Sequence, residues 1–283
     1  MRRLRDSFAA LVADGDRCDL GRAALEIGRL ERPDLDPDHY LRQLDALADG
    51  VRIRLGRGLR PEDAVRSLTA YLFGECGFRG NNDEYYDPRN SFLSEVLERR
   101  LGIPISLSLL LMETGARLGL PIQGVGFPGH FLVRVAGSGG PLLLDPFFGG
   151  RVVERDEMLR RLRAFSRAGG GGAGEDPQRV LPQVLQTTGA IGILGRMLAN
   201  LLRIYLDRDD RMHALAAVEL MLVLSPDAPD HLRVRGLLYE QLECVDAAAS
   251  DLRRYLELAP SSPHAADARE RLAQLARVAV TVH

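Results

Sequence analysis

The chain has 283 residues, of which 46% are apolar and 27% are charged, and its net charge is −2. This length allows two domains with buried cores, and the balanced charge argues against a nucleic-acid partner or a charged membrane surface. All 37 basic residues are Arg, so no Lys can serve as a Schiff base, a general base or part of a Walker-type phosphate loop. No apolar run approaches the length of a bilayer span, so we expect no membrane segment.

The cysteines and histidines favour neither a disulfide framework nor a metal site. Cys18, Cys76 and Cys244 are far apart and form no CxxC pair, which argues against both. The six His residues show no HExxH motif and no other metal-ligand spacing. We therefore expect no metal and no cofactor, and unpaired thiols predict a cytoplasmic protein. The N-terminus has the pattern of an amphipathic helix, not of a signal peptide.

Helices are predicted through most of the first hundred residues. The amphipathic segments 5–13 and 20–31 come first, and Asp36 with Pro37 predicts the start of a helix that continues to about residue 48. Pro61 begins another helix, which ends near Cys76, and the turn-rich segment 77–90 is expected to be a loop. Charged runs such as Glu98-Arg99-Arg100 and Arg160-Arg161 are predicted to be solvated helix faces.

The next sixty residues predict two helices and then strands. Asn90 is the expected N-cap of the first helix, and Gly102 is expected to end it. Pro104 begins the second helix, which is apolar nearly all round and should be buried, and Gly119 closes it. Short apolar runs then predict strands in 121–127, 130–135 and 141–147, with a hairpin turn at 137–140. This order of elements predicts an α+β domain with a small antiparallel sheet.

A glycine-rich segment is expected to divide the chain into two domains. Four consecutive Gly at 169–172 cannot hold a helix or strand, so we expect a linker or loop at 166–177. Beyond it, Tyr205 and Tyr239, and Pro226 and Pro260, are each 34 residues apart, which is the tetratricopeptide period. The predicted domains are residues 1–165, an α+β domain, and residues 178–283, an all-α region of about two and a half repeats.

One His and one Asp fall where a cysteine-type hydrolase carries its catalytic pair. Such an enzyme holds its nucleophile in the first turn of a buried helix, where an anion is favoured, with a His and an Asp on neighbouring strands. Here His130 and Asp145 lie 15 residues apart, on segments predicted to form a hairpin. The helix after Pro104 offers only Ile105 and Ser106 in place of a Cys.

The segments YYDPRNSFLSEVLERRLGIPISLSLLL, RLGLPIQGVGFPGHFLVRV and LLLDPFFGG resemble the transglutaminase-like core of the bacterial SirB-type family, which pairs that core with tetratricopeptide repeats. The core motif covers residues 85–153, and GLLYEQLECVDAAASDL is similar to the repeat part. The resemblance implies a papain-like α+β fold. It implies that His130 and Asp145 stand at the superfamily's His and Asp positions and that Ile105 or Ser106 stands at the Cys position.

Each candidate residue also has a purely structural interpretation. Ser106 can bond to the backbone of its own turn, and His130 and Asp145 can stabilise turns next to Pro. Cys76 precedes the motif by about 30 residues, which makes it a poor nucleophile candidate. A further group could line a binding cleft or pack against it: Asn90, Tyr85, Tyr86 and Arg89.

These features favour a protein- or peptide-binding scaffold, a pseudoenzyme whose partner contacts the helical repeats or the cleft. The alternative is a hydrolase or acyl-transferase that uses Ser106 as nucleophile, His130 as base and Asp145 to orient the His. A Ser hydroxyl at this position would need a hydrogen-bonded base and an oxyanion hole. The family resemblance also leaves open a regulator of transcription or secretion that acts through protein contacts. The oligomeric state is not predicted.

Overall fold

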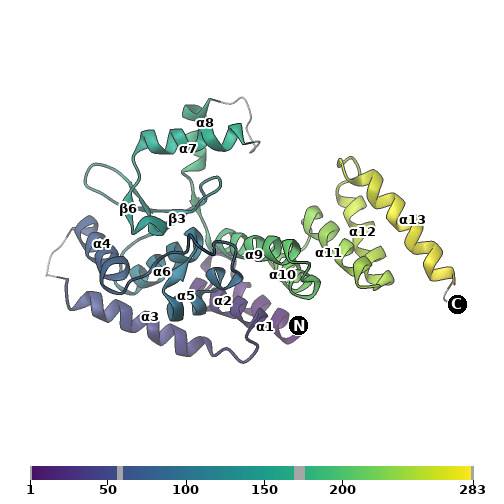
Figure 1. Ribbon diagram of the computed structural model, residues 1–283, viewed down its shortest axis with the longest axis horizontal. Coiled ribbons are helices and arrows are strands. Elements are labelled where there is room, and N and C mark those ends of the chain that lie inside the picture. Colours follow the sequence, from purple (N-terminus) through teal and green to yellow (C-terminus); the bar gives the residue numbers. More distant parts are fainter. Residues whose placement is uncertain (1, 56–59, 169–175, 282–283) are drawn as a thin grey trace. The chain divides into compact units, whose positions relative to one another are not determined.

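The computed structural model describes residues 2–55, 60–168 and 176–281, which form two compact units (Figure 1). One unit is Asp14–Met197, which contains helices and a small sheet. The other combines Met1–Ala13 with Leu198–His283, and its described residues are helical. The predicted α+β fold with a helical C-terminal region is therefore confirmed.

Helices make up the first part of the Asp14–Met197 unit. As predicted, Asp36 caps a helix that starts with Pro37, because its carboxylate accepts a hydrogen bond from the backbone N–H of Asp38 at 3.0 Å. That helix runs beyond the predicted end. The elements are η1 (Gly15–Arg17), α2 (Leu20–Ile27), η2 (Gly28–Leu30), α3 (Pro37–Arg52), α4 (Pro61–Thr69), the π-helix η3 (Ala70–Glu75), η4 (Pro88–Ser91), α5 (Leu93–Arg99) and α6 (Pro104–Arg117).

Two predicted helix boundaries are wrong. Asn90 does not cap α5, because it lies inside the 3₁₀ turn η4, and α5 begins at Leu93. Gly102 does not end α5 either. The helix stops earlier, at Arg100, whose φ of 62° places it in the left-handed region.

A five-stranded antiparallel sheet follows α6. Its order is β6-β5-β4-β3-β7, with β4 and β5 joined by the predicted hairpin, in which the N–H of Gly140 donates to the carbonyl of Gly137 at 3.1 Å. The register pairs Val125 with Leu132 and Val133 with Leu144. The strands are β3 (Gln123–Val125), β4 (Leu132–Val135), β5 (Leu142–Asp145), β6 (Arg151–Val152) and β7 (Thr187–Thr188), with the 3₁₀ turn η5 (Pro146–Phe148) after β5.

The sheet is covered by helices on both faces (Figure 1). The buried helix α6 lies against β3 and β4 on one face. On the other face α7 (Arg155–Arg167) and α8 (Pro177–Val184) pack on the strands. This second core contains Val125, Phe127, Leu132, Leu143, Val153, Met158, Leu159, Leu162 and Leu181. Because successive strand residues alternate between faces, short apolar strands fill both cores.

A separate two-stranded parallel ladder lies beside η5. It pairs β1 (Arg79–Gly80) with β2 (Leu101–Gly102) and so ties the loop before η4 to the start of α6. β1 also contacts η5. The predicted loop at 77–90 is therefore anchored at both ends by short regular elements.

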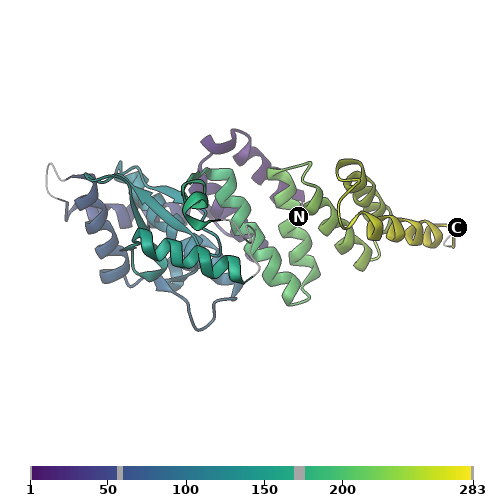
Figure 2. The same cartoon turned by 90° about the horizontal axis from the view of Figure 1, so that it is seen from above.

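The remaining helices form the other unit. Helices α10 (Arg211–Leu224), α11 (Pro229–Gln241), α12 (Val245–Leu258) and α13 (Ala265–Thr281) each contact the next one in sequence, as stacked helical repeats do. α9 (Ala190–Asp207) precedes them, and the unit boundary falls within it. The N-terminal helix α1 (Arg2–Val12) lies beside α10, the purple and green helices of Figure 2.

The predicted domain boundary differs from this division. Residues 169–175 of the predicted linker lie outside the described residues, and on either side of them α7 ends and α8 begins. The compact units instead divide near residues 13 and 198, because α1 packs with the C-terminal helices. Within the described ranges, no helix has the length and apolarity that crossing a bilayer requires.

Candidate functional site

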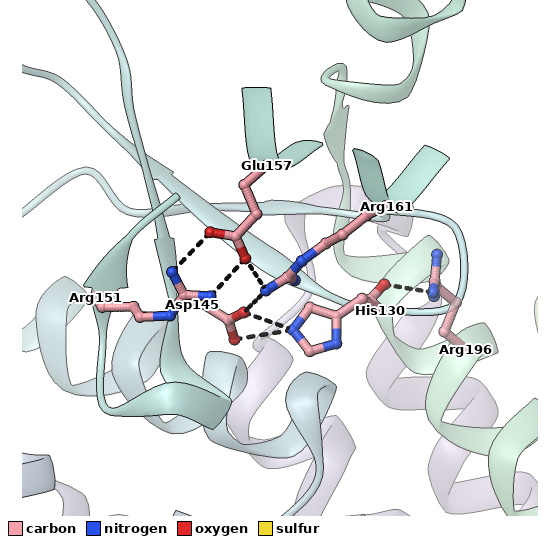
Figure 3. Close-up of polar contacts among 6 residues, drawn as sticks. All are labelled: His130, Asp145, Arg151, Glu157, Arg161 and Arg196. Carbon is pink, nitrogen blue, oxygen red and sulfur yellow. Dashed lines mark hydrogen bonds and ion pairs between the residues drawn. The ribbon is translucent and has the colours of Figure 1, made fainter. Parts of the chain in front are cut away.

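His130 and Asp145 meet at the edge of the sheet where β4 begins and β5 ends. The turn before β4 is closed by a hydrogen bond from the N–H of His130 to the carbonyl of Phe127 at 3.0 Å, and Gly129 has a φ of +67° that suits glycine. Asp145 is the last residue of β5. Because β4 and β5 are neighbours, Nε2 of His130 lies 2.9 Å from each carboxylate oxygen of Asp145 (Figure 3).

The Asp145 carboxylate is fully buried and has a second partner, a guanidinium. Nη2 of Arg161, on α7, lies 3.0 Å from Oδ2 of Asp145 and 2.6 Å from Oε1 of Glu157. Glu157 in turn binds Arg151 of β6, with 2.8 Å between Oε2 and Nη1. The charges alternate along this chain of side chains (Figure 3), which offsets the cost of burying a carboxylate.

The hydrogen bond to Asp145 also fixes the chemistry of the imidazole. A carboxylate only accepts hydrogen bonds, so Nε2 of His130 carries the hydrogen. In the neutral ring Nδ1 is then left as an acceptor or general base. Among the described residues, Nδ1 of His130 has no hydrogen-bond partner. The arrangement can therefore accept a proton or hydrogen bond from a bound molecule.

Arg196 holds the other side of the His130 turn. Its Nη2 donates to the carbonyl of His130 at 2.9 Å (Figure 3). The same nitrogen donates to the carbonyl of Phe127 at 3.2 Å, and the guanidinium lies over the ring of Phe131 at 5.4 Å. Burial lowers the pKa of Arg196, because the protein interior stabilises the charged guanidinium less than water does. A guanidinium in this position fixes the backbone from which His130 projects.

Aromatic side chains surround the imidazole. Phe148 stacks on the His130 ring at 6.2 Å with an interplanar angle of 25°, and Phe147 meets it edge-on at 6.2 Å. Tyr85 lies edge-on to Phe147 at 6.0 Å and to Tyr86 at 5.3 Å. The side chains of Tyr86 and Phe148 are 59% and 50% exposed. Tyr85 thus contacts Phe147, a neighbour of the His130 ring, and Tyr86 contacts Tyr85.

Ser106 makes its hydrogen bonds with the backbone. Its Oγ donates to the carbonyl of Asn90 at 2.6 Å and lies 3.2 Å from the carbonyl of Ile103, and it accepts from the N–H of Ile103 at 3.0 Å. The residue is fully buried in the first turn of α6. Within the described part of the chain, Ser106 makes no hydrogen bond with His130.

Asn90 and Arg89 stabilise the loop before α5. The Asn90 amide donates to the carbonyls of Glu84 and Tyr85 and accepts from Nδ2 of Asn81 at 3.0 Å. Arg89 pairs with Asp87, with 2.9 Å between Nε and Oδ2. The side chain of the fully buried Asn90 thus holds the backbone at Tyr85. The backbone carbonyl of Asn90 accepts the hydrogen bond from Ser106.

Neither Ile105 nor Cys76 supplies a nucleophile at His130. Ile105 is an apolar residue buried in the core. Cys76 follows the π-helix η3, and its thiol bonds the hydroxyl of Tyr71, which raises the pKa of that phenol. Among the described residues, no group of three or more His, Cys, Asp or Glu side chains could hold a metal ion.

Helix α7 contributes to the site in a way that the sequence does not predict. Arg161 was predicted to lie on a solvated helix face, but it bonds Asp145. The available signal was the spacing of Glu157 and Arg161, which places both on one face of a helix, next to the apolar Met158 and Leu162. No local signal identified Arg196, because its partners are backbone carbonyls of residues far away in the chain.

Comparison with known proteins agrees with this fold. Residues 38–199 match the family model of the transglutaminase-like superfamily, and residues 201–273 match a tetratricopeptide repeat model. Fold and site thus define a transglutaminase-like domain followed by tetratricopeptide repeats. No solved structure gave a significant match.

Relatives of similar length extend the match to most of the chain. A UPF0162 protein of Xylella fastidiosa (strain Temecula1) is 40% identical over 96% of this chain and 95% of its own length. A UPF0162 protein of Vibrio cholerae is 32% identical over 89% and 90%. Protein SirB1 of Salmonella typhimurium is 26% identical over 94% and 95%. The chain belongs to the UPF0162 family of the transglutaminase-like superfamily, and the SirB-type resemblance is confirmed.

Proposed function

We propose that this protein binds a protein or peptide partner, and that its transglutaminase-like domain holds the partner without breaking a bond in it. The hydrogen bonding of Ser106 carries this proposal. A nucleophilic hydroxyl must reach both a base and a substrate, but the Ser106 hydroxyl is buried and bonded to the carbonyl of Asn90. An imidazole without a neighbouring nucleophile can still hydrogen-bond a bound peptide.

The exposed aromatic side chains beside His130 support a peptide-binding surface. Phe148 is stacked on His130, and the guanidinium of Arg151 lies 5.5 Å from the centre of its ring, so the ring has two neighbours that hold it. Rigid aromatic side chains are frequent anchors in protein interfaces because they bury a large area at little entropic cost. Tetratricopeptide helices commonly provide a second protein-binding surface. The cytoplasmic location that we propose rests on three free cysteines.

The alternative function is an acyl hydrolase with a Ser106-His130-Asp145 triad, and the close pairing of His130 with Asp145 favours it. Acyl, amide and ester probes given to the intact chain distinguish the two functions. We expect no turnover beyond the uncatalysed rate and no labelling by a fluorophosphonate. Turnover that disappears in both Ser106→Ala and His130→Ala, but persists in Ser108→Ala, would overturn the binding proposal.

The same pair of serine variants tests the structural role of Ser106. Removing its hydroxyl leaves the Ile103 N–H and the Asn90 carbonyl unpaired, so we expect Ser106→Ala to lower the unfolding free energy by about 1–3 kcal/mol. Ser108 is equally buried in α6, but its hydroxyl has no partner among the described residues. Ser108→Ala should therefore be neutral or slightly stabilising in urea titrations. Equal losses in the two variants would contradict this role.

The peptide-binding surface is tested by selection from a phage-displayed library of random peptides on the full chain. We expect enriched sequences whose binding falls about tenfold or more in Phe148→Ala, as for an anchor residue. Ile53→Ala is the matched control, because Ile53 is an exposed apolar residue (85%) just after α3 and belongs neither to these aromatic side chains nor to the repeat helices. Enriched peptides that bind Phe148→Ala and the unaltered chain equally would exclude Phe148 from the binding surface.

A further inference from the structure

Arg100 has a backbone conformation that its residue type does not favour. It follows α5 with φ 62° and ψ 16°, in the left-handed region where glycine is the usual residue. Its N–H donates to the carbonyl of Val96, and its carbonyl accepts from the N–H of Arg79, both at 2.9 Å. The side chain at this position therefore leaves the helix end in a fixed direction. A strained residue that carries a charge points to a function for the side chain.

The guanidinium of Arg100 makes no ion pair with another residue in the described part of the chain. Its Cζ lies 4.5 Å from the centre of the Phe78 ring, and its buried Nη1 has no hydrogen-bond partner among the described residues. Neighbouring guanidiniums differ, since Arg99 pairs with Asp87 at 3.3 Å and Arg54 with Glu75 at 2.7 Å. Nη1 itself is closed to solvent, but Arg100 is half-buried and its other guanidinium nitrogens remain accessible, so an anion there would gain a charge-assisted hydrogen bond.

Arg100 lines a cavity of about 210 Å³ between α3, η3 and α5. The wall is mostly apolar. Its polar residues are Arg100, which is a cation, Tyr71, which has a phenol, and Gln43, which has an amide. These surroundings suit a small molecule with one charged end and an apolar body. The lining residues are Gln43, Ala46, Leu47, Tyr71, Phe78, Leu97 and Arg100.

We propose that this cavity binds a small carboxylic acid, with its carboxylate on Arg100 and its apolar body against Leu47, Leu97 and Phe78. A single guanidinium matches the single charge and planar geometry of a carboxylate. A phosphate dianion would need more donors than the lining supplies. This site shares no residue with the surroundings of His130, so it is independent of the proposed partner binding.

Isothermal titration of the intact chain with benzoate and with benzamide tests the proposal. The two molecules have nearly the same shape, but only benzoate carries a charge. We expect benzoate to bind about tenfold or more tightly, the effect of a charge-assisted hydrogen bond. Equal affinity for the two probes, or binding of neither, would overturn the proposal.

Three variants connect the binding to Arg100. Arg100→Gly should fold at least as well as the unaltered chain, because glycine favours the left-handed region, but it should lose benzoate binding. Ala46→Trp places a large side chain at an exposed lining position and should block the cavity while Arg100 remains. Arg42→Gln removes an exposed charge of α3 that does not line the cavity and should leave binding unchanged. Benzoate binding that survives in Arg100→Gly would refute the site.

Discussion

Glu157 binds two arginines at once and connects Asp145 with β6. Its carboxylate lies 2.8 Å from Nη1 of Arg151 and 2.6 Å from Nη2 of Arg161. The Arg151 guanidinium, followed by that of Arg161, lowers the pKa of Glu157 to about 2 from its usual 4.5. The negative charge of Glu157 thus keeps Arg161 in place beside the Asp145 carboxylate.

This lowered pKa predicts a pH-dependent stability. A carboxyl group with a lower pKa in the folded state stabilises the fold above its unfolded pKa, and this contribution is lost as the pH falls from about 4.5 towards 2. Glu157→Gln should therefore reduce the unfolding free energy by about 1 kcal/mol or less at neutral pH, the range of partly exposed ion pairs. The difference between the two proteins should disappear near pH 2 in urea titrations at stepped pH.

Glu84→Gln is the matched control for this titration. The exposed carboxylate of Glu84 has no ion pair with another described residue. Its removal should change the unfolding free energy little, and equally at each pH. A pH-independent difference between Glu157→Gln and the unaltered chain would show that the two arginines do not stabilise the carboxylate.

At the scale of elements, the short β1–β2 ladder allows the ring of Phe147 to lie close to the backbone of β1. Gly80 pairs with Gly102, and a Cβ built on Gly80 would lie 2.6–2.7 Å from three atoms of the Phe147 ring. Only a residue without a side chain allows this contact. Since Phe147 lies edge-on to both His130 and Tyr85, the ladder supports the aromatic surroundings of the imidazole.

Gly80→Ala should therefore displace Phe147 and lower the unfolding free energy by about 1–3 kcal/mol, as overpacking does. The ring-proton NMR signals of His130 should move, because the Phe147 ring current changes. Gly74→Ala, in η3, is the control, since a Cβ there meets no heavy atom within 4 Å. A Gly80→Ala protein with unchanged stability and unchanged His130 signals would show that this close contact is unimportant.

The elements that could be predicted from the sequence are those fixed by adjacent residues. Pro104 begins α6 because its fixed φ suits the first helical turn, and the glycines at 137–140 form the hairpin turn between β4 and β5. Asn90 was misassigned because its amide bonds the backbone of residues 84 and 85, a loop whose path no local pattern reveals. α5 ends at Arg100 in the left-handed conformation that glycine usually adopts, whereas the glycine that predicted the end of this helix, Gly102, lies two residues later.

The site could be predicted only in part, for the same reason. The spacing of His130 and Asp145 on a hairpin is a local property, and the structure pairs them. The position of the Ser106 hydroxyl depends on the Asn90 carbonyl, 16 residues earlier, and the partners of Arg161 and Arg196 lie on distant elements. Such contacts follow from the packing of α6, α7 and α9 and not from any periodicity.

At the scale of the whole molecule, the N-terminal helix belongs with the helical repeats. α1 buries Leu4, Phe8 and Val12, which recur at the spacing of one helix face, and it lies beside α10. A short repeat array leaves an apolar surface at its end, and a further helix can cover it. We infer that α1 acts as this covering helix, although the sequence begins with it and the repeats lie near the other end.

This assignment predicts that a core mutation in α1 weakens the helical unit selectively. Phe8→Ala removes a fully buried ring and should cost about 3–5 kcal/mol, so amide hydrogen exchange should become faster in α10. Phe92→Ala makes the same change in the Asp14–Met197 unit, where Phe92 is 2% exposed, and should accelerate exchange in β4 and β5. Because local stability follows the contacts of each unit, each variant should leave the other unit's protection unchanged. Faster exchange of β4 and β5 in Phe8→Ala, with α10 still protected, would place α1 with the sheet-containing unit.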